Sequence, residues 1–118
     1  MIYILDDDEA VRDSLTLLLQ SHGFAVVSFA LAADFVRVYK PGGKDCLILD
    51  HHLPGVTGLD FLASAEVADL DLPVILITGG ANPGIRKRAQ ELGVVAFFEK
   101  PVTEGPLLAA IGGALGGA

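Results

Sequence analysis

Residues 2–8 read IYILDDD, so a short apolar run passes directly into three acids. Three later apolar runs, at 46–49, 74–77 and 94–98, also lead into polar residues. Short apolar runs separated by helical patterns are typical of buried parallel strands. The residues that follow the four runs are Asp6, Asp7, Asp8, Asp50, Thr78, Glu99 and Lys100. Ligands bind at the carboxyl ends of the strands in an open parallel sheet, so the sequence predicts one site at that edge.

Strand and helix patterns alternate along the whole chain. The predicted strands are about 2–6, 24–28, 46–50, 73–77 and 94–98. The predicted helices are about 8–22, 31–39, 58–68, 83–92 and a last one from about 103. This alternation predicts an α/β fold in which a five-stranded parallel sheet is doubly wound, with helices on both faces. The length of 118 residues predicts one domain, 1–118, whose glycine-rich end at about 112–118 is a fraying helix end or the start of a linker.

Composition restricts the partners and the setting. The net charge of -7 argues against direct binding of nucleic acid, because phosphate contacts need a basic face. No apolar run approaches the roughly 20 residues of a membrane span, and no signal peptide is expected before the first strand. Cys46, the single cysteine, cannot form an internal disulfide and is expected to be buried filler. A reducing, cytoplasmic setting is therefore expected.

The adjacent acids Asp6, Asp7 and Asp8 allow two interpretations. An acid here would cap the following helix, and Asp8 is well placed for that role. Alternatively, Asp6, Asp7 and Asp50 lie on neighbouring strand ends, where two charges roughly 4 Å apart repel by about 4 kcal/mol. Such a cluster must be protonated, paired or bound to a metal, and Lys100 alone does not balance three acids. The addition of Asp50 favours a Mg²⁺ site.

Thr78 and Lys100 indicate which chemistry such a metal site would serve. Neither residue is needed to hold Mg²⁺, but a hydroxyl and an ammonium both donate hydrogen bonds to phosphoryl oxygens. A carboxylate nucleophile such as Asp50, with a metal and two such donors, forms a phosphoryl-transfer site. Thr78 and Lys100 are each of a common residue type, so this prediction depends on the ordered set of acids, hydroxyl and ammonium at successive strand ends.

The ordered set resembles the response-regulator receiver domain of two-component signalling, from Ile2 to about Leu115. The matching residues are Asp6-Asp7, Asp50 with Leu53-Pro54 and Gly58, Thr78, and Lys100-Pro101. The resemblance implies a flavodoxin-like (βα)5 fold with strand order 2-1-3-4-5. It also implies a cis peptide bond between Lys100 and Pro101.

By this resemblance, Asp50 accepts a phosphoryl group from a histidine kinase or a phosphotransfer protein. Mg²⁺ would be bound by Asp7, Asp50 and the backbone carbonyl of His52, with Asp6 acting through water. The phosphoryl group would be bound by the following groups: Thr78, Lys100 and the backbone amides of Gly79 and His52. The domain would be a phosphoacceptor rather than an enzyme, with only intrinsic autophosphorylation and autodephosphorylation.

The resemblance also implies a switch. Thr78 would move toward the phosphoryl group, and Phe97 would change rotamer in response. The face formed by the fourth helix, fifth strand and fifth helix would then control an output domain or effector protein, or form a homodimer. On the fourth predicted helix, Arg86-Lys87-Arg88 is either a solvated face or part of such a contact.

Three alternative functions fit the sequence less well. A phosphatase would use Asp6 as nucleophile and Asp8 as acid, but that family usually has threonine where this chain has Ala10. A flavin-binding domain would need a Ser/Thr/Gly-rich loop after the first strand, where this chain has acids. A degenerate receiver that only binds partners would lack phosphorylation residues that are present here.

His51-His52 and Gly79-Gly80 are further motifs near the predicted site. The two histidines could suggest a soft-metal site, but adjacent side chains on an extended chain point in opposite directions. The glycines could suggest a phosphate-cradling loop, but no Lys-Thr or Lys-Ser follows, which favours a plain turn. That turn would be flexible in the region expected to switch.

Overall fold

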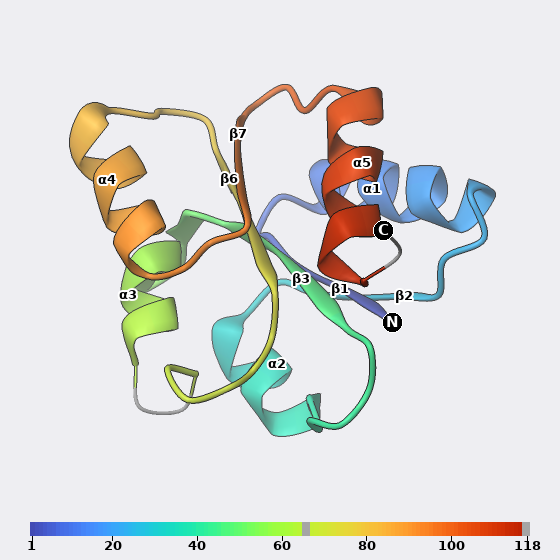
Figure 1. Cartoon of the computed structure of the whole chain (residues 1–118), viewed down its shortest axis with the longest axis horizontal. Coiled ribbons are helices and arrows are strands. Elements are labelled where there is room, and N and C mark those ends of the chain that lie inside the picture. The colour runs from blue at the N-terminus through green and yellow to red at the C-terminus, as the bar shows by residue number, and fades with distance from the viewer. Residues whose placement is uncertain (65–66, 117–118) are drawn as a thin grey trace.

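The computed structural model describes residues 1–64 and 67–116, in which five strands form a central sheet covered by helices (Figure 1). The strands are β1 (Ile2–Leu5), β2 (Val26–Phe29), β3 (Cys46–Asp50), β4 (His52–Leu53), β5 (Val56–Thr57), β6 (Val74–Thr78) and β7 (Ala96–Glu99). The helices are α1 (Glu9–Ser21), α2 (Ala32–Val38), α3 (Gly58–Ala63), α4 (Pro83–Glu91) and α5 (Glu104–Ala114). None of the described helices is long and apolar enough to cross a membrane.

The main sheet has the order β2-β1-β3-β6-β7, and every neighbouring pair is parallel. Counted over these five strands, this is the predicted order 2-1-3-4-5. The register places Leu5 beside Leu49 and Thr78 beside Glu99, so β1, β3, β6 and β7 end at the same edge of the sheet. The polar residues that follow or end these strands are thereby brought together.

The sheet divides the core into two clusters. One cluster packs against α2, α3 and α4 and includes Phe35, Leu59 and Ala89. The other packs against α1 and α5 and includes Leu19 and Ile111. Figure 1 shows α1 and α5 together on one side of the strands and the other helices opposite them. Alternate residues of the buried strands supply both clusters, which is why these strands are almost entirely apolar.

Most of the predicted boundaries agree with the structure to within one or two residues, but the third helix is shorter than predicted. It was expected over 58–68, yet α3 ends at Ala63. Ser64 takes an extended backbone, and its N–H and hydroxyl both donate to the Phe61 carbonyl. Serine competes for helix carbonyls in this way, which favours helix ends. Ala65 and Glu66, within the predicted range, lie outside the described residues.

A short hairpin that the sequence did not predict follows β3. β4 and β5 pair antiparallel, with His52 opposite Thr57, around Pro54 and Gly55. Gly55 has φ +78°, a left-handed conformation that glycine adopts without strain. At the other end of the chain, α5 runs to Ala114, and residues 117–118 of the expected fraying segment lie outside the described residues.

Candidate functional site

Three carboxylates meet at the carboxyl edge of the sheet, as predicted. Asp6 and Asp7 follow β1, and Asp50 ends the neighbouring β3. One oxygen from each carboxylate lies within 4.8 Å of the other two. Asp6 and Asp50 are buried, whereas Asp7 is exposed. Oxygen ligands of this kind, open to solvent on one side, suit a hard divalent cation.

Asp8, the third acid of the run, has a different role. It is the N-cap of α1, and its Oδ1 accepts hydrogen bonds from the N–H groups of Ala10 (2.9 Å) and Val11 (3.2 Å). Asp6 in turn accepts the Asp8 N–H at 2.9 Å, and Arg12 donates to the Asp6 carbonyl at 2.8 Å. The cap interpretation is therefore confirmed for Asp8, while Asp6 and Asp7 stay free of capping and lie with Asp50 in a cluster that could hold a metal ion.

Lys100 reaches the cluster from the residue after β7. Its Nζ lies 3.2 Å from Asp6 Oδ2 and 3.5 Å from Asp50 Oδ1. Burial alone would lower the pKa of Lys100, but the hydrogen bond and charge of Asp6, with Asp50, outweigh it and raise the pKa. The Lys100–Pro101 peptide bond is cis, which confirms the expectation from the resemblance.

The charge of Asp50 is only partly compensated. Burial, and then the charge of Asp6, raise the pKa of Asp50 from 3.8 to about 6, although Lys100 and the His52 backbone amide act in the opposite direction. Lys100 is shared with Asp6, which it approaches more closely. Oδ1 of Asp50 is buried and accepts no hydrogen bond from any described residue. A divalent cation fits this oxygen, because it would supply the missing charge and coordination.

The Thr78 hydroxyl is fully buried at the end of β6. Its Oγ1 accepts the Gly80 N–H at 3.1 Å and lies 3.3 Å from Nε2 of His52. The side-chain contact of His52 with Thr78 was not predicted from the sequence. The contact depends on the β4–β5 hairpin, which directs the His52 ring toward Thr78 and which no sequence pattern indicated.

The loop after Asp50 is packed against the start of α3. A Cβ atom added at Gly58 would lie 2.7 Å from the Asp50 carbonyl oxygen and 2.9 Å from the His51 Cα, so only glycine fits. His51 is buried, with its Nδ1 unbonded among the described residues, whereas His52 is exposed. The expectation that the two rings point in opposite directions is wrong, because His51 lies in a bend and the ring centroids are 5.3 Å apart.

Phe97 lies on β7 beside Leu76, two pairs of residues before the pair of Thr78 and Glu99. Its ring is partly exposed and packs at the edge of the cluster formed with α2, α3 and α4. The guanidinium of Arg86, from α4, lies 4.5 Å from the ring centroid. The two predicted switch residues, Thr78 and Phe97, therefore lie on neighbouring parallel strands, two pairs apart in the register.

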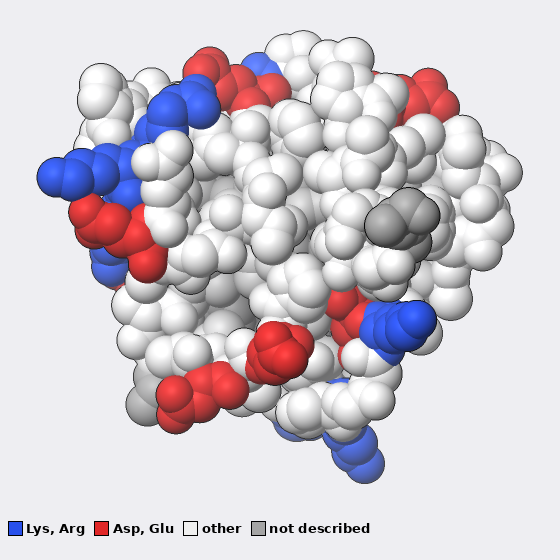
Figure 2. Space-filling view, in the orientation of Figure 1, with Lys and Arg blue, Asp and Glu red and all other residues white. Residues whose placement is uncertain are grey.

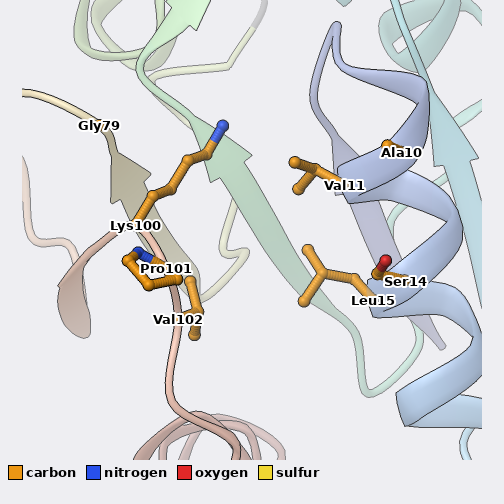
Figure 3. A pocket seen from close by; sticks show the side chains of 8 residues that line it. All are labelled: Ala10, Val11, Ser14, Leu15, Gly79, Lys100, Pro101 and Val102. Carbon is orange, nitrogen blue, oxygen red and sulfur yellow. The ribbon is translucent and has the colours of Figure 1, made fainter.

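A groove of about 540 Å³ opens beside the carboxylates (Figure 3). One wall is α1, with Ala10, Val11, Ser14 and Leu15. The other is formed by Gly79 and the segment Lys100–Val102, and the Lys100 side chain extends along the groove in Figure 3. The predicted phosphoryl-binding residue Gly79 thus lines the same groove as Lys100, whose ammonium contacts Asp6 and Asp50.

Comparison with known proteins identifies the family. The family model described as "Response regulator receiver domain" matches residues 2–112. The "Transcriptional regulatory protein FixJ" of Azorhizobium caulinodans is 35% identical over 115 residues, which cover 98% of this chain and 54% of that protein. The "Response regulator protein TodT" of Pseudomonas putida is 38% identical, with 98% and 51% covered.

Solved structures agree with the sequence relatives. The response regulator StyR superposes with a TM-score of 0.89 at 33% identity, over 98% of this chain and 58% of that one. The chain spans about half the length of the curated relatives it matches. The carboxylate cluster, the strand order and these similarities agree, and the chain belongs to the response regulator receiver domains, the phosphoacceptor modules of two-component signalling.

Proposed function

We propose that Asp50 is the phosphoacceptor and that a histidine kinase or phosphotransfer protein supplies the phosphoryl group. The observation that carries this proposal is the buried, unbonded Oδ1 of Asp50, 3.5 Å from the Lys100 ammonium and close to two further acids. The Asp50 oxygen attacks phosphorus, the bond from phosphorus to the donor imidazole breaks, and the imidazole, protonated on its other ring nitrogen, leaves as a neutral ring with the electron pair of that bond. The product is an aspartyl phosphate.

Asp7, Asp50 and the backbone carbonyl of His52 would hold Mg²⁺, with Asp6 acting through water. When bound, the ion would neutralise charge on the carboxylates and on the phosphoryl oxygens. Lys100 supports this assignment because it is anchored to Asp6 and can stay beside Asp50 as the phosphoryl group arrives. Its ammonium, the Thr78 hydroxyl and the Gly79 N–H would then donate to phosphoryl oxygens.

A phosphatase that uses Asp6 as nucleophile and Asp8 as acid is disfavoured. The Asp8 carboxylate accepts two backbone N–H groups at the start of α1, so it is oriented along the helix. Asp6 already contacts Lys100 and the Asp8 N–H. We infer that the domain has only intrinsic autophosphorylation and autodephosphorylation chemistry and acts on its partners by binding.

A small phosphodonor tests the acceptor directly. Incubation with acetyl phosphate and Mg²⁺ should add one phosphoryl group to the intact protein, as measured by mass spectrometry, and Asp50→Asn should add none. Asp8→Asn is the matched control, because asparagine also caps helices and the acceptor is untouched. Release of phosphate that persists in Asp50→Asn but is lost in Asp6→Asn would indicate the phosphatase instead. A wild-type protein that neither gains the group nor releases phosphate would support the degenerate receiver.

Phosphorylation should change the surface formed by α4, β7 and α5. Thr78 would turn toward a phosphoryl oxygen and give up its contacts with Gly80 and His52, and Phe97 would turn inward. This face would then engage an output domain, an effector protein or a second copy of the chain. We propose that phosphorylation and partner binding take place in the cytoplasm, as expected from the single, buried Cys46.

Removal of the Thr78 hydroxyl should uncouple the remote surface from the acceptor. With Mg²⁺ and beryllofluoride, a mimic of the phosphoryl group, we expect altered hydrogen exchange over residues 79–100 of the wild type. In Thr78→Ala we expect the changes to be confined to the surroundings of Asp50, because the hydroxyl that links phosphoryl group and loop is gone. Remote changes that persist in Thr78→Ala would rule out this route.

A further inference from the structure

We propose that Arg86 is a positioning residue that holds Phe97 in its outward rotamer and so sets how readily the domain switches. This inference rests on the proposed function of Asp50 and concerns its regulation. Arg86 lies on α4, with its guanidinium carbon 4.5 Å from the Phe97 ring centroid. A cation within about 6 Å of an aromatic face is attracted by the ring quadrupole.

Glu99 completes the contact. Its Oε1 lies 3.6 Å from Nη2 of Arg86. Phe97 and Glu99 are two residues apart on β7, so their side chains leave the same face of the strand. A single guanidinium from α4 therefore contacts both a ring and a carboxylate of one strand. Because the Arg86 and Glu99 side chains are 53% and 60% exposed, the ion pair contributes little, and the ring contact dominates.

The Phe97 ring is partly exposed, and it is at this position that the Arg86 guanidinium reaches it. Phe97 is paired with Leu76, and Thr78 is two pairs further along the strands, on the same face of β6 as Leu76. A ring that turns toward the space vacated by Thr78 moves inward, away from the surface on which Arg86 lies. An interaction made in one state only shifts the population toward that state. Arg86 therefore favours the inactive conformation and opposes the conformation that phosphorylation stabilises.

The neighbouring cations of α4 do not share this arrangement. Figure 2 shows basic side chains gathered over α4 with acidic ones beside them. Arg88 pairs with Asp60 of α3 at 2.6 Å. Lys87 is exposed and forms no ion pair with any residue that the structure describes. Lys87 thus carries the same charge on the same helix without the ring contact, which makes it a matched control.

The test is the affinity for beryllofluoride at saturating Mg²⁺, followed through the amide signals of residues 79–100. Arg86→Met should bind the mimic about two- to fivefold more tightly than the wild type, as expected for the loss of an exposed cation–π contact. Lys87→Met should leave the affinity unchanged, and Glu99→Gln should have a smaller effect than Arg86→Met. In a Phe97→Leu background, Arg86→Met should have no further effect, because leucine has no ring to contact.

Two further readouts separate this role from a structural one. The stability to urea and the Mg²⁺ affinity without beryllofluoride should be unchanged in Arg86→Met, while side-chain couplings of Phe97 should report a smaller outward population. If Arg86→Met and Lys87→Met increased the affinity for beryllofluoride equally, the proposed role of Arg86 would be wrong. The same conclusion would follow if Arg86→Met increased this affinity as much in the Phe97→Leu background as in the wild type. A wild type that binds no beryllofluoride, like Asp50→Asn, instead overturns the proposed function, and the role of Arg86 with it.

Discussion

Replacement of Gly58 by alanine should lower the free energy of unfolding by about 3 kcal/mol, the upper end for overpacking of a rigid site. The added Cβ would lie 2.7 Å from the Asp50 carbonyl oxygen and 2.9 Å from the His51 Cα. Both neighbours are backbone atoms that cannot rotate away. Because the displaced backbone belongs to Asp50 and His51, the affinity for Mg²⁺ should fall as well. Urea unfolding and a Mg²⁺ titration measure the two effects.

Gly112→Ala is the control for this substitution. Gly112 lies inside α5, where an added Cβ meets no atom within 4 Å. The exchange should therefore stabilise the protein by about 0.5–1 kcal/mol, because glycine loses more backbone entropy in a helix. If Gly58→Ala also stabilised the domain or left it unchanged, the close packing of the loop after Asp50 against α3 would be wrong.

Without a divalent cation, the domain should become less stable as the pH rises from about 4 to about 7. Burial and Asp6 raise the pKa of Asp50 from 3.8 to about 6, so the folded state holds this proton more tightly than the unfolded chain. A raised carboxyl pKa stabilises the fold fully below the unfolded value, and this stabilisation is lost as the pH passes through about 6. The loss should amount to about 3 kcal/mol.

Urea unfolding at each pH, with a chelator or with Mg²⁺, measures this dependence. Millimolar Mg²⁺ at neutral pH should restore stability, because a ligand that binds the folded state raises its free energy of unfolding. In Asp50→Asn, the part of the fall in the free energy of unfolding that is due to Asp50 should be absent. The other carboxylates contribute equally to both proteins, so their contributions cancel when the variant is compared with the wild type. An equally steep loss in Asp50→Asn would show that Asp50 is not its source.

The buried strands were the most predictable part of the fold. β3 was predicted at its observed boundaries, because five consecutive buried residues end in an acid and a loop. The start of α1 was equally clear, because Asp8 precedes the helical pattern and forms its cap. The carboxylate cluster followed from these elements, since parallel strands that end in acids bring those acids to one edge.

Other features depend on contacts that no local pattern encodes. β4 and β5 have two residues each, too few for any periodicity to appear. The bend at His51 brings the two histidine rings into contact, although a continued strand would have separated them. The contact of Arg86 with Phe97 joins a helix to a strand through tertiary packing. These features, and the contact of His52 with Thr78, could be recognised only in the structure.

The groove and the Arg86 contact lie on opposite faces of the sheet. Val11, Leu15 and Val102 of the groove pack with the core cluster under α1 and α5. Phe97 packs with the other cluster, under α4. A phosphodonor seated over the groove would leave Arg86 and Phe97 uncovered. Loading from the groove would therefore leave the contact of Arg86 with Phe97 in place until the phosphoryl group has arrived.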